Sequence, residues 1–117
     1  MQAFEILRQS FEQQGKLLAC GNGGSASDAD HIVGELMKGF LLPRRLPAEE
    51  QDKLNALAGQ EIGQLLQGAL PAIALNAGHA LATAVMNDNS PAMVFAQQVY
   101  GLARKGDVLL GLRKVDA

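Results

Sequence analysis

The stretch that decides the fold is Leu17-Leu-Ala-Cys-Gly-Asn-Gly-Gly-Ser25, with the pattern that continues from it to Phe40. Its first four residues are apolar and predict a short buried strand, which ends in a glycine-rich turn over residues 21–25. Apolar residues then recur three or four positions apart, which predicts an amphipathic helix over residues 25–40. The order is therefore strand, glycine-rich turn and helix.

This turn has the features of an anion-binding site. The first turn of a helix carries unpaired N–H groups and a partial positive charge, and Gly23 and Gly24 allow close approach of a ligand. We expect Ser25 to cap the helix and to offer its hydroxyl to the same anion. The glycine spacing matches neither the dinucleotide nor the Walker pattern, so a phosphate group on a small ligand fits better than a nucleotide cofactor. A tight turn with an ordinary serine cap is the alternative.

The predicted helix also carries a pair of chemically active side chains. His31 and Glu35 are four residues apart and share a face, with Asp28 near the same face. A histidine and a carboxylate one turn apart suit proton transfer or metal binding. A solvated polar face is the alternative for such a pair.

The rest of the chain alternates helices and strands. Strands that alternate with helices predict a parallel sheet covered on both faces, with ligands bound beyond the carboxyl ends of the strands. Arg44 and Arg45 contact a phosphate or an acidic neighbour in one interpretation and lie in a solvated loop in the other. The patterns predict further helices over residues 2–14, 47–57, 61–67, 79–86 and 93–104, and strands over residues 72–75 and 107–112.

Composition is that of an ordinary globular domain. The 117 residues suit one domain, with 48% hydrophobic and 19% charged residues, and the net charge of −2 gives no basic footprint for nucleic acid. No apolar run approaches the ~20 residues of a membrane span, and no signal peptide is visible. The single cysteine, Cys20, favours inert packing over a nucleophilic role and fits a reducing compartment, so we expect a cytoplasmic protein.

Several of these residues together carry a resemblance to a known family. Cys20-Gly-Asn-Gly-Gly-Ser25, with Asp28, His31 and Glu35 at these offsets, resembles the phosphoheptose isomerase branch of the sugar isomerase (SIS) domain family. Residues 69–75 followed by Asn87-Asp88, and residues 95–101 followed by 106–112, fit the same branch. The resemblance implies a three-layer αβα sandwich with a parallel, flavodoxin-like sheet, and it covers most of residues 17–112.

The resemblance also implies an activity and a set of site residues. The activity is an aldose–ketose isomerisation of sedoheptulose 7-phosphate to a heptose 7-phosphate through an enediolate, with Glu35 as the base. His31 and Glu35 match positions that can bind zinc in this family, although two ligands alone make a weak zinc site. The implied substrate-binding residues are Asn22, Gly23, Gly24, Ser25 and Asp88.

The chain departs from the family pattern at its carboxyl end. Residues 113–117, Arg-Lys-Val-Asp-Ala, stand where the family has a Ser/Thr-rich phosphate loop, and the later strands and the helix with a second catalytic histidine do not follow. We therefore expect one SIS domain over residues 1–117 that is incomplete, with about three strands and an unpaired apolar edge at 107–112. An insertion over about 44–70 is expected to shape the rim of the site or a subunit contact.

Alternative functions remain beside the isomerase. Some SIS proteins bind phosphosugars without catalysis, and one close branch associates with the replication initiator. A fragment without activity is a further interpretation. The family implies a homotetramer with sites at subunit interfaces, a phosphorylated sugar as ligand, and no direct contact with nucleic acid or membrane.

Overall fold

The first strand along the chain is the middle strand of the sheet. The structure is a computed structural model that describes residues 2–114. β1 (Leu17–Cys20) pairs in parallel with β2 (Ala72–Ala74) on one side and with β3 (Val108–Gly111) on the other, which gives the strand order β2-β1-β3. The predicted strand positions and the parallel sheet are confirmed, and the chain has an α/β fold.

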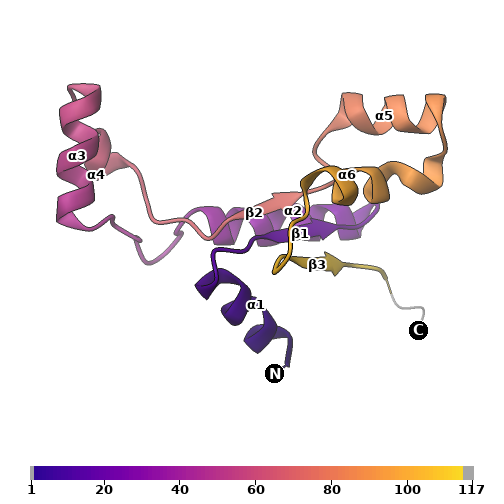
Figure 1. The fold of residues 1–117 in the computed structure, drawn as a ribbon, viewed down its shortest axis with the longest axis horizontal. Helices are drawn as coiled ribbons and strands as arrows, with labels where there is room; N and C mark the ends of the chain where they lie inside the picture. The colour runs from indigo at the N-terminus through magenta and orange to yellow at the C-terminus, as the bar shows by residue number, and fades with distance from the viewer. Residues whose placement is uncertain (1, 115–117) are drawn as a thin grey trace.

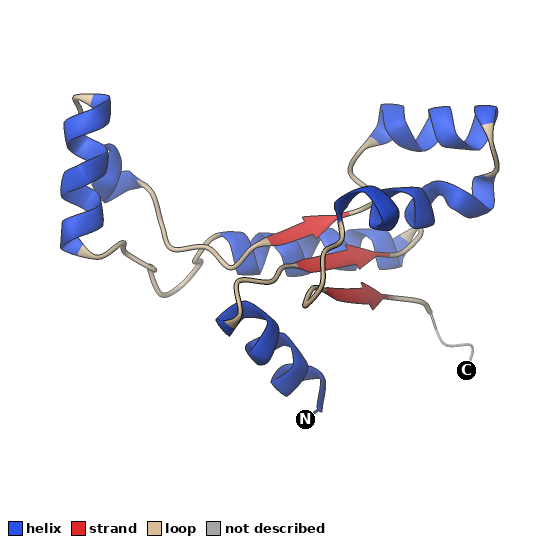
Figure 2. Cartoon of the chain, viewed as in Figure 1, coloured by secondary structure: helices blue, strands red, loops and turns tan. Residues whose placement is uncertain are grey.

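Helical segments connect the strands, and each predicted helix is present with its ends shifted by a few residues (Figures 1 and 2). They are α1 (Gln2–Glu12), α2 (Gly24–Met37), α3 (Ala48–Ala58), α4 (Ile62–Leu65), α5 (His79–Asp88), the 3-10 segment η1 (Pro91–Met93) and α6 (Val94–Leu102). Among residues 2–114, no helix has both the length and the apolar composition needed to cross a membrane.

The helices pack around the sheet unequally. α2 packs against β1 and β2 and lies behind the strands in Figure 1. α5, η1 and α6 pack on one another beyond the end of β2, and α1 contacts β3. The arrow heads of the three strands in Figure 2 point the same way, so their carboxyl ends meet at one edge of the sheet.

The core is small for a chain of this length. The radius of gyration is 16.9 Å, whereas a compact chain of this size has one of about 13 Å. Many large apolar side chains are exposed, among them Phe4, Phe40 and Leu57. The buried apolar residues are Leu17, Leu18, Ala19, Ala29, Ala72 and Leu75.

Helix α2 ends three residues earlier than predicted. The predicted apolar face included Phe40, but α2 stops at Met37 and the Phe40 side chain is 77% exposed, so that part of the prediction is wrong. The reason lies in Arg44, whose guanidinium donates to the carbonyl oxygens of Glu35 and Leu36 and so caps the last turn. Arg44 lies in the loop after α2, and its contact with the end of the helix is a role that neither interpretation included.

The amino end of the sheet is tied together by side chains. Asp107, just before β3, accepts hydrogen bonds from the backbone N–H groups of Lys16 and Arg104, and its Oδ2 lies 2.6 Å from Nζ of Lys16. These donors, with the Lys16 ammonium first, lower the pKa of the Asp107 carboxyl to about 2. Ser10 donates to the carbonyl oxygen of Gly106 over 2.6 Å. These hydrogen bonds and the ion pair fix α1, β1 and β3 to one another.

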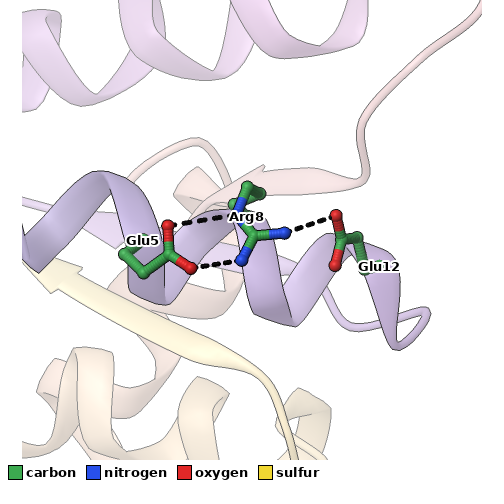
Figure 3. Close-up of polar contacts among 3 residues, drawn as sticks. All are labelled: Glu5, Arg8 and Glu12. Carbon is green, nitrogen blue, oxygen red and sulfur yellow. Dashed lines mark hydrogen bonds and ion pairs between the residues drawn. The ribbon is translucent and has the colours of Figure 1, made fainter.

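Helix α1 presents a charged face to solvent. Arg8 lies between Glu5 and Glu12 and bonds to both carboxylates (Figure 3). The Arg8 guanidinium lowers the pKa of the Glu5 carboxyl. Pairs spaced three and four residues apart lie on one face of a helix and stabilise it only modestly when they are exposed to solvent.

Strand β3 forms an edge of the sheet, as predicted. Its hydrogen-bonded neighbour within residues 2–114 is β1 alone. Leu109 on this strand is 54% exposed. The apolar edge expected from the sequence is therefore present in this part of the chain.

Candidate functional site

The turn between β1 and α2 lies at the carboxyl edge of the sheet. Gly21 is buried, and a Cβ there would come within 2.8 Å of the backbone of Ser25, so no larger residue fits. Gly23 has a φ of 58°, which favours glycine. These two positions explain the glycines of the turn through close packing and backbone conformation.

The predicted cap of α2 is wrong. Gly23 occupies the N-cap position and no side chain bonds to the first turn, whereas Ser25 is the second residue of the helix. The turn closes instead through its backbone, because the N–H groups of Ser25 and Ala26 donate to the carbonyl oxygens of Asn22 and Gly23 over 3.0 Å. The amides of Gly23 and Gly24 have no partner among the described residues, so an anion can still use them.

A cavity of about 540 Å³ opens at this turn. The helix side of the cavity is formed by Asn22, Gly24, Ser25 and Asp28. Its other wall comes from the segment after β3, which contributes Leu112, Arg113 and Lys114. Two cations thus stand opposite the positive end of α2, and the cavity has one carboxylate, that of Asp28, in its lining, so its charge suits an anion.

Sequence reasoning missed the two cations as part of this site. Arg113 and Lys114 were treated as the point where the chain departs from the family pattern. The signal is nevertheless present in the sequence, since both cations follow within three residues of the end of a strand that neighbours β1, and neighbouring parallel strands end at the same edge.

Asn22 also borders a second cavity. This space of about 500 Å³ lies between β2 and the α5–α6 region and is lined by Asn76, Met86, Phe95 and their neighbours. Asp88, predicted to bind substrate, is the last residue of α5 and lines neither cavity. Gly23 lines neither cavity as well, although it belongs to the same turn.

Two side-chain amides, those of the buried Gln98 and the half-buried Asn76, hold the carboxyl end of β2. Gln98 of α6 donates to the carbonyl oxygen of Leu75 over 2.7 Å. Asn76 donates to Asp30 on α2 over 3.0 Å, and its own Oδ1 is buried without a partner among the described residues. These contacts position the second cavity relative to α2.

His31 and Glu35 form a pair on α2, as the spacing predicts. His31 Nε2 lies 3.2 Å from Oε1 of Glu35, and their side chains are 76% and 54% exposed. We would expect a catalytic carboxylate to be partly removed from water, but residues 2–114 leave the side chain of Glu35 more than half exposed. Ten residues of helix separate Glu35 from Ser25, which is about 15 Å along the axis.

Glu35 and the turn therefore do not share a cavity in this chain. Glu35 lines a separate hollow of about 340 Å³ with Gly39, Phe40 and Arg44 among its walls. The structure brings Asn22, Gly24 and Ser25 together, whereas His31 lies in the middle of α2 and Glu35 in its last turn, and neither lines that cavity. The insertion does not form the rim of the cavity at the turn either, because α3 and α4 lie at the opposite end in Figure 1.

Within the described part of the chain, His31 and Glu35 have no third metal ligand. No group of three His, Cys, Asp or Glu side chains is placed to hold an ion in residues 2–114. A zinc site takes three or four protein ligands, so these two residues alone do not fit one.

Cys20 ends β1 beside the turn. The residue is partly buried, and this burial raises the pKa of its thiol. A raised pKa disfavours the thiolate, which is the nucleophilic form. The geometry thus supports the packing role over the nucleophilic one.

Comparisons with known proteins agree on one kind of relative. A phosphoheptose isomerase of Nitratiruptor sp. is 40% identical over 107 residues, which cover 92% of this chain and 45% of that protein. One of Helicobacter pylori is 38% identical over 95% of this chain and 46% of its own length. No protein-family model matches the chain.

Solved structures give the same result. A phosphoheptose isomerase from Francisella tularensis has a TM-score of 0.72 and 31% identity, over 97% of this chain and 47% of that one. The Neisseria gonorrhoeae phosphoheptose isomerase has a TM-score of 0.66 and 34% identity, over 97% and 46%. The chain thus spans a little under half the length of the relatives that it matches.

Proposed function

Because this chain is a homologue of the phosphoheptose isomerases over the part of them that it spans, we propose that it binds a phosphorylated sugar at the β1–α2 turn. The observation that carries the proposal is the cavity where Asn22, Gly24 and Ser25 face Arg113 and Lys114. Backbone amides at a helix start and two cations suit a phosphate group. The sugar hydroxyls would then lie toward Asn22.

We further propose that the protein takes part in the isomerisation of sedoheptulose 7-phosphate and a heptose 7-phosphate. Glu35 is the proposed base. Its carboxylate removes the proton from the carbon beside the carbonyl and delivers it to the former carbonyl carbon, while a second proton passes between the two oxygens. Removal of the first proton gives the enediolate intermediate, and return of the proton to the neighbouring carbon gives the isomeric sugar phosphate with no gain or loss of atoms.

The position of Glu35 sets a condition on this proposal. A sugar phosphate held at Ser25 is about 15 Å from Glu35 along α2, which is out of reach for proton transfer. Glu35 would therefore act at a site completed by another subunit, consistent with the homotetramer that the family implies. His31 and Glu35 would supply two of the ligands if zinc binds there, and we propose a cytoplasmic location.

A non-catalytic phosphosugar-binding protein is the second candidate. The observation that favours it is the separation of the turn from Glu35, since binding requires only the turn and its cavity. In this case the chain would bind the phosphosugar and convert none of it.

Titration of the purified chain with sedoheptulose 7-phosphate tests the binding proposal. We expect saturable heat in calorimetry with the phosphorylated sugar and none with sedoheptulose, because the cavity selects for the phosphate. Arg113→Gln with Lys114→Gln should weaken binding, whereas Arg104→Gln with Lys105→Gln, outside the cavity, should not. Equal heats with and without phosphate would overturn the proposal.

The isomerase proposal needs a separate assay. Conversion of sedoheptulose 7-phosphate by the wild-type protein, lost in Glu35→Gln with binding retained, would support Glu35 as the base. Binding without conversion by the wild type would favour the non-catalytic candidate. Full activity of Glu35→Gln would remove Glu35 from the mechanism.

A further inference from the structure

Helices α3 and α4 form an arm that stands apart from the sheet. They pack mainly against each other, and Figure 1 shows them at the end of the molecule opposite the carboxyl ends of the strands. Gly63 of α4 lies against the backbone of Gln51, and Asn55 bonds to Gly63 and Gln64, so the two helices form one unit. We define the arm as residues 47–66.

The surface of the arm is apolar and acidic. Leu57, Leu65 and Leu66 are 87%, 78% and 46% exposed. Four carboxylates and one lysine give the arm a net charge of −3; they are Glu49, Glu50, Asp52, Lys53 and Glu61. Exposed leucines on a projecting unit, beside a net negative charge, are typical of a contact surface.

The segment that leads into the arm has the opposite character. We call residues 38–45 the neck. Phe40, Leu41 and Leu42 are 77%, 85% and 81% exposed and line the hollow of about 340 Å³ described above. Lys38, Arg44 and Arg45 give the neck a net charge of +3, with no acidic residue among them.

We propose that the arm of one copy of this chain docks on the neck of a second copy. The leucines of the arm would cover Phe40, Leu41 and Leu42, and its carboxylates would face the three cations of the neck. The occupant is a second copy because equal and opposite charges accompany exposed apolar residues on the same chain. In a two-fold dimer the arm–neck contact forms twice, because each copy contributes one arm and one neck. This inference does not depend on the proposed activity.

Charge reversal on the two surfaces tests the proposal. The neck variant is Lys38→Glu with Arg45→Glu, which leaves the α2 cap of Arg44 intact. The arm variant is Glu50→Lys with Asp52→Lys. In sedimentation velocity, each variant alone should form a smaller species than the wild type, because like charges then oppose docking. The matched control, Arg104→Glu with Lys105→Glu, makes the same charge change elsewhere and should behave as the wild type.

Mixing the two variants gives the decisive measurement. In a mixed pair, the acidic neck of the neck variant faces the basic arm of the arm variant. Opposite charges therefore meet again at this contact, with their signs exchanged between arm and neck. We expect a mixed species larger than either variant alone, and a tagged neck variant should retain the arm variant but not itself. Restoration by mixing would show that the contact joins two chains.

A variant with two leucines replaced controls for misfolding of the charge-reversal variants. Leu57→Ser with Leu65→Ser removes exposed side chains that contact little within the chain, so helical circular dichroism should be unchanged while association weakens. The proposal is overturned if the wild type is a monomer, if the arm and neck variants associate as the wild type does, or if the mixture stays dissociated. In those cases another surface, such as the face of α1, carries any association.

Discussion

The two ends of the sheet are built in different ways. At the amino end, Asp107 and Ser10 hold three segments through short side-chain hydrogen bonds, and both side chains are at most 7% exposed. At the carboxyl end, two cavities open around Asn22, and exposed cations stand at the rim. One end is closed by polar contacts and the other presents polar groups to a ligand. Changes at the first should therefore alter stability, and changes at the second should alter binding.

The largest effect is expected from Asp107→Ala. Three donors then lose their acceptor, and the Lys16 ammonium is left partly buried beside them. The free energy of unfolding should fall by about 3 kcal/mol, as for loss of one partner from a buried pair. Urea unfolding followed by circular dichroism measures it. Asp107→Asn, which keeps one acceptor oxygen, should lose less, and a loss equal to that of alanine would contradict the role of these hydrogen bonds.

Acid should weaken the same end. The pKa of Asp107 is about 2 in the folded chain and has an ordinary value of 3.8, so the folded state favours the carboxylate. Its contribution to stability is therefore complete above about pH 4 and is lost as the pH falls toward 2. Urea midpoints across this range should decline more in the wild type than in Asp107→Asn. Parallel declines in the two proteins would assign the acid sensitivity to other groups.

Ser10→Ala should have a smaller effect at the closed end. Ser10 is 5% exposed and its hydroxyl bonds to the carbonyl of Gly106 over 2.6 Å. Loss of this hydrogen bond should cost about 1 kcal/mol of unfolding free energy. The urea midpoint should fall while the slope with denaturant stays constant, and an unchanged midpoint would show that the contact contributes nothing.

Ser25→Ala is the matched change at the open end and should have the smallest effect on stability. Ser25 does not cap α2, so the unfolding free energy should change by less than about 0.5 kcal/mol. Calorimetric affinity for sedoheptulose 7-phosphate should nevertheless fall, because Ser25 lines the proposed phosphate cavity. A loss of stability as large as that of Ser10→Ala would remove the contrast between the two ends.

Local patterns in the sequence were sufficient for the strands. Leu17–Cys20 is a run of apolar residues before glycine, and the observed β1 has the same bounds. The pairing of His31 with Glu35 also followed from helical spacing alone. Both features depend on residues close together in the chain, where periodicity carries the information.

Features that depend on distant residues could not be predicted in this way. Lys16 and Asp107 are separated by 91 positions, and no local pattern connects them. The end of α2 was misplaced for a related reason, because the apolar spacing continues to Phe40 while Arg44 caps the helix from beyond it. The cap at Ser25 was assigned from residue type, and the backbone of Gly23 took that position instead.

Arg44 connects the end of α2 with the segment that returns from the arm to the sheet. The guanidinium donates to the carbonyl oxygen of Glu35, and the backbone carbonyl oxygen of Arg44 accepts the N–H of Gly68, in the segment that follows the arm. The last turn of α2, which carries Glu35, is thus joined to the segment after the arm by Arg44, and also by the N–H of Leu70, which donates to the carbonyl oxygen of Leu36 over 2.9 Å.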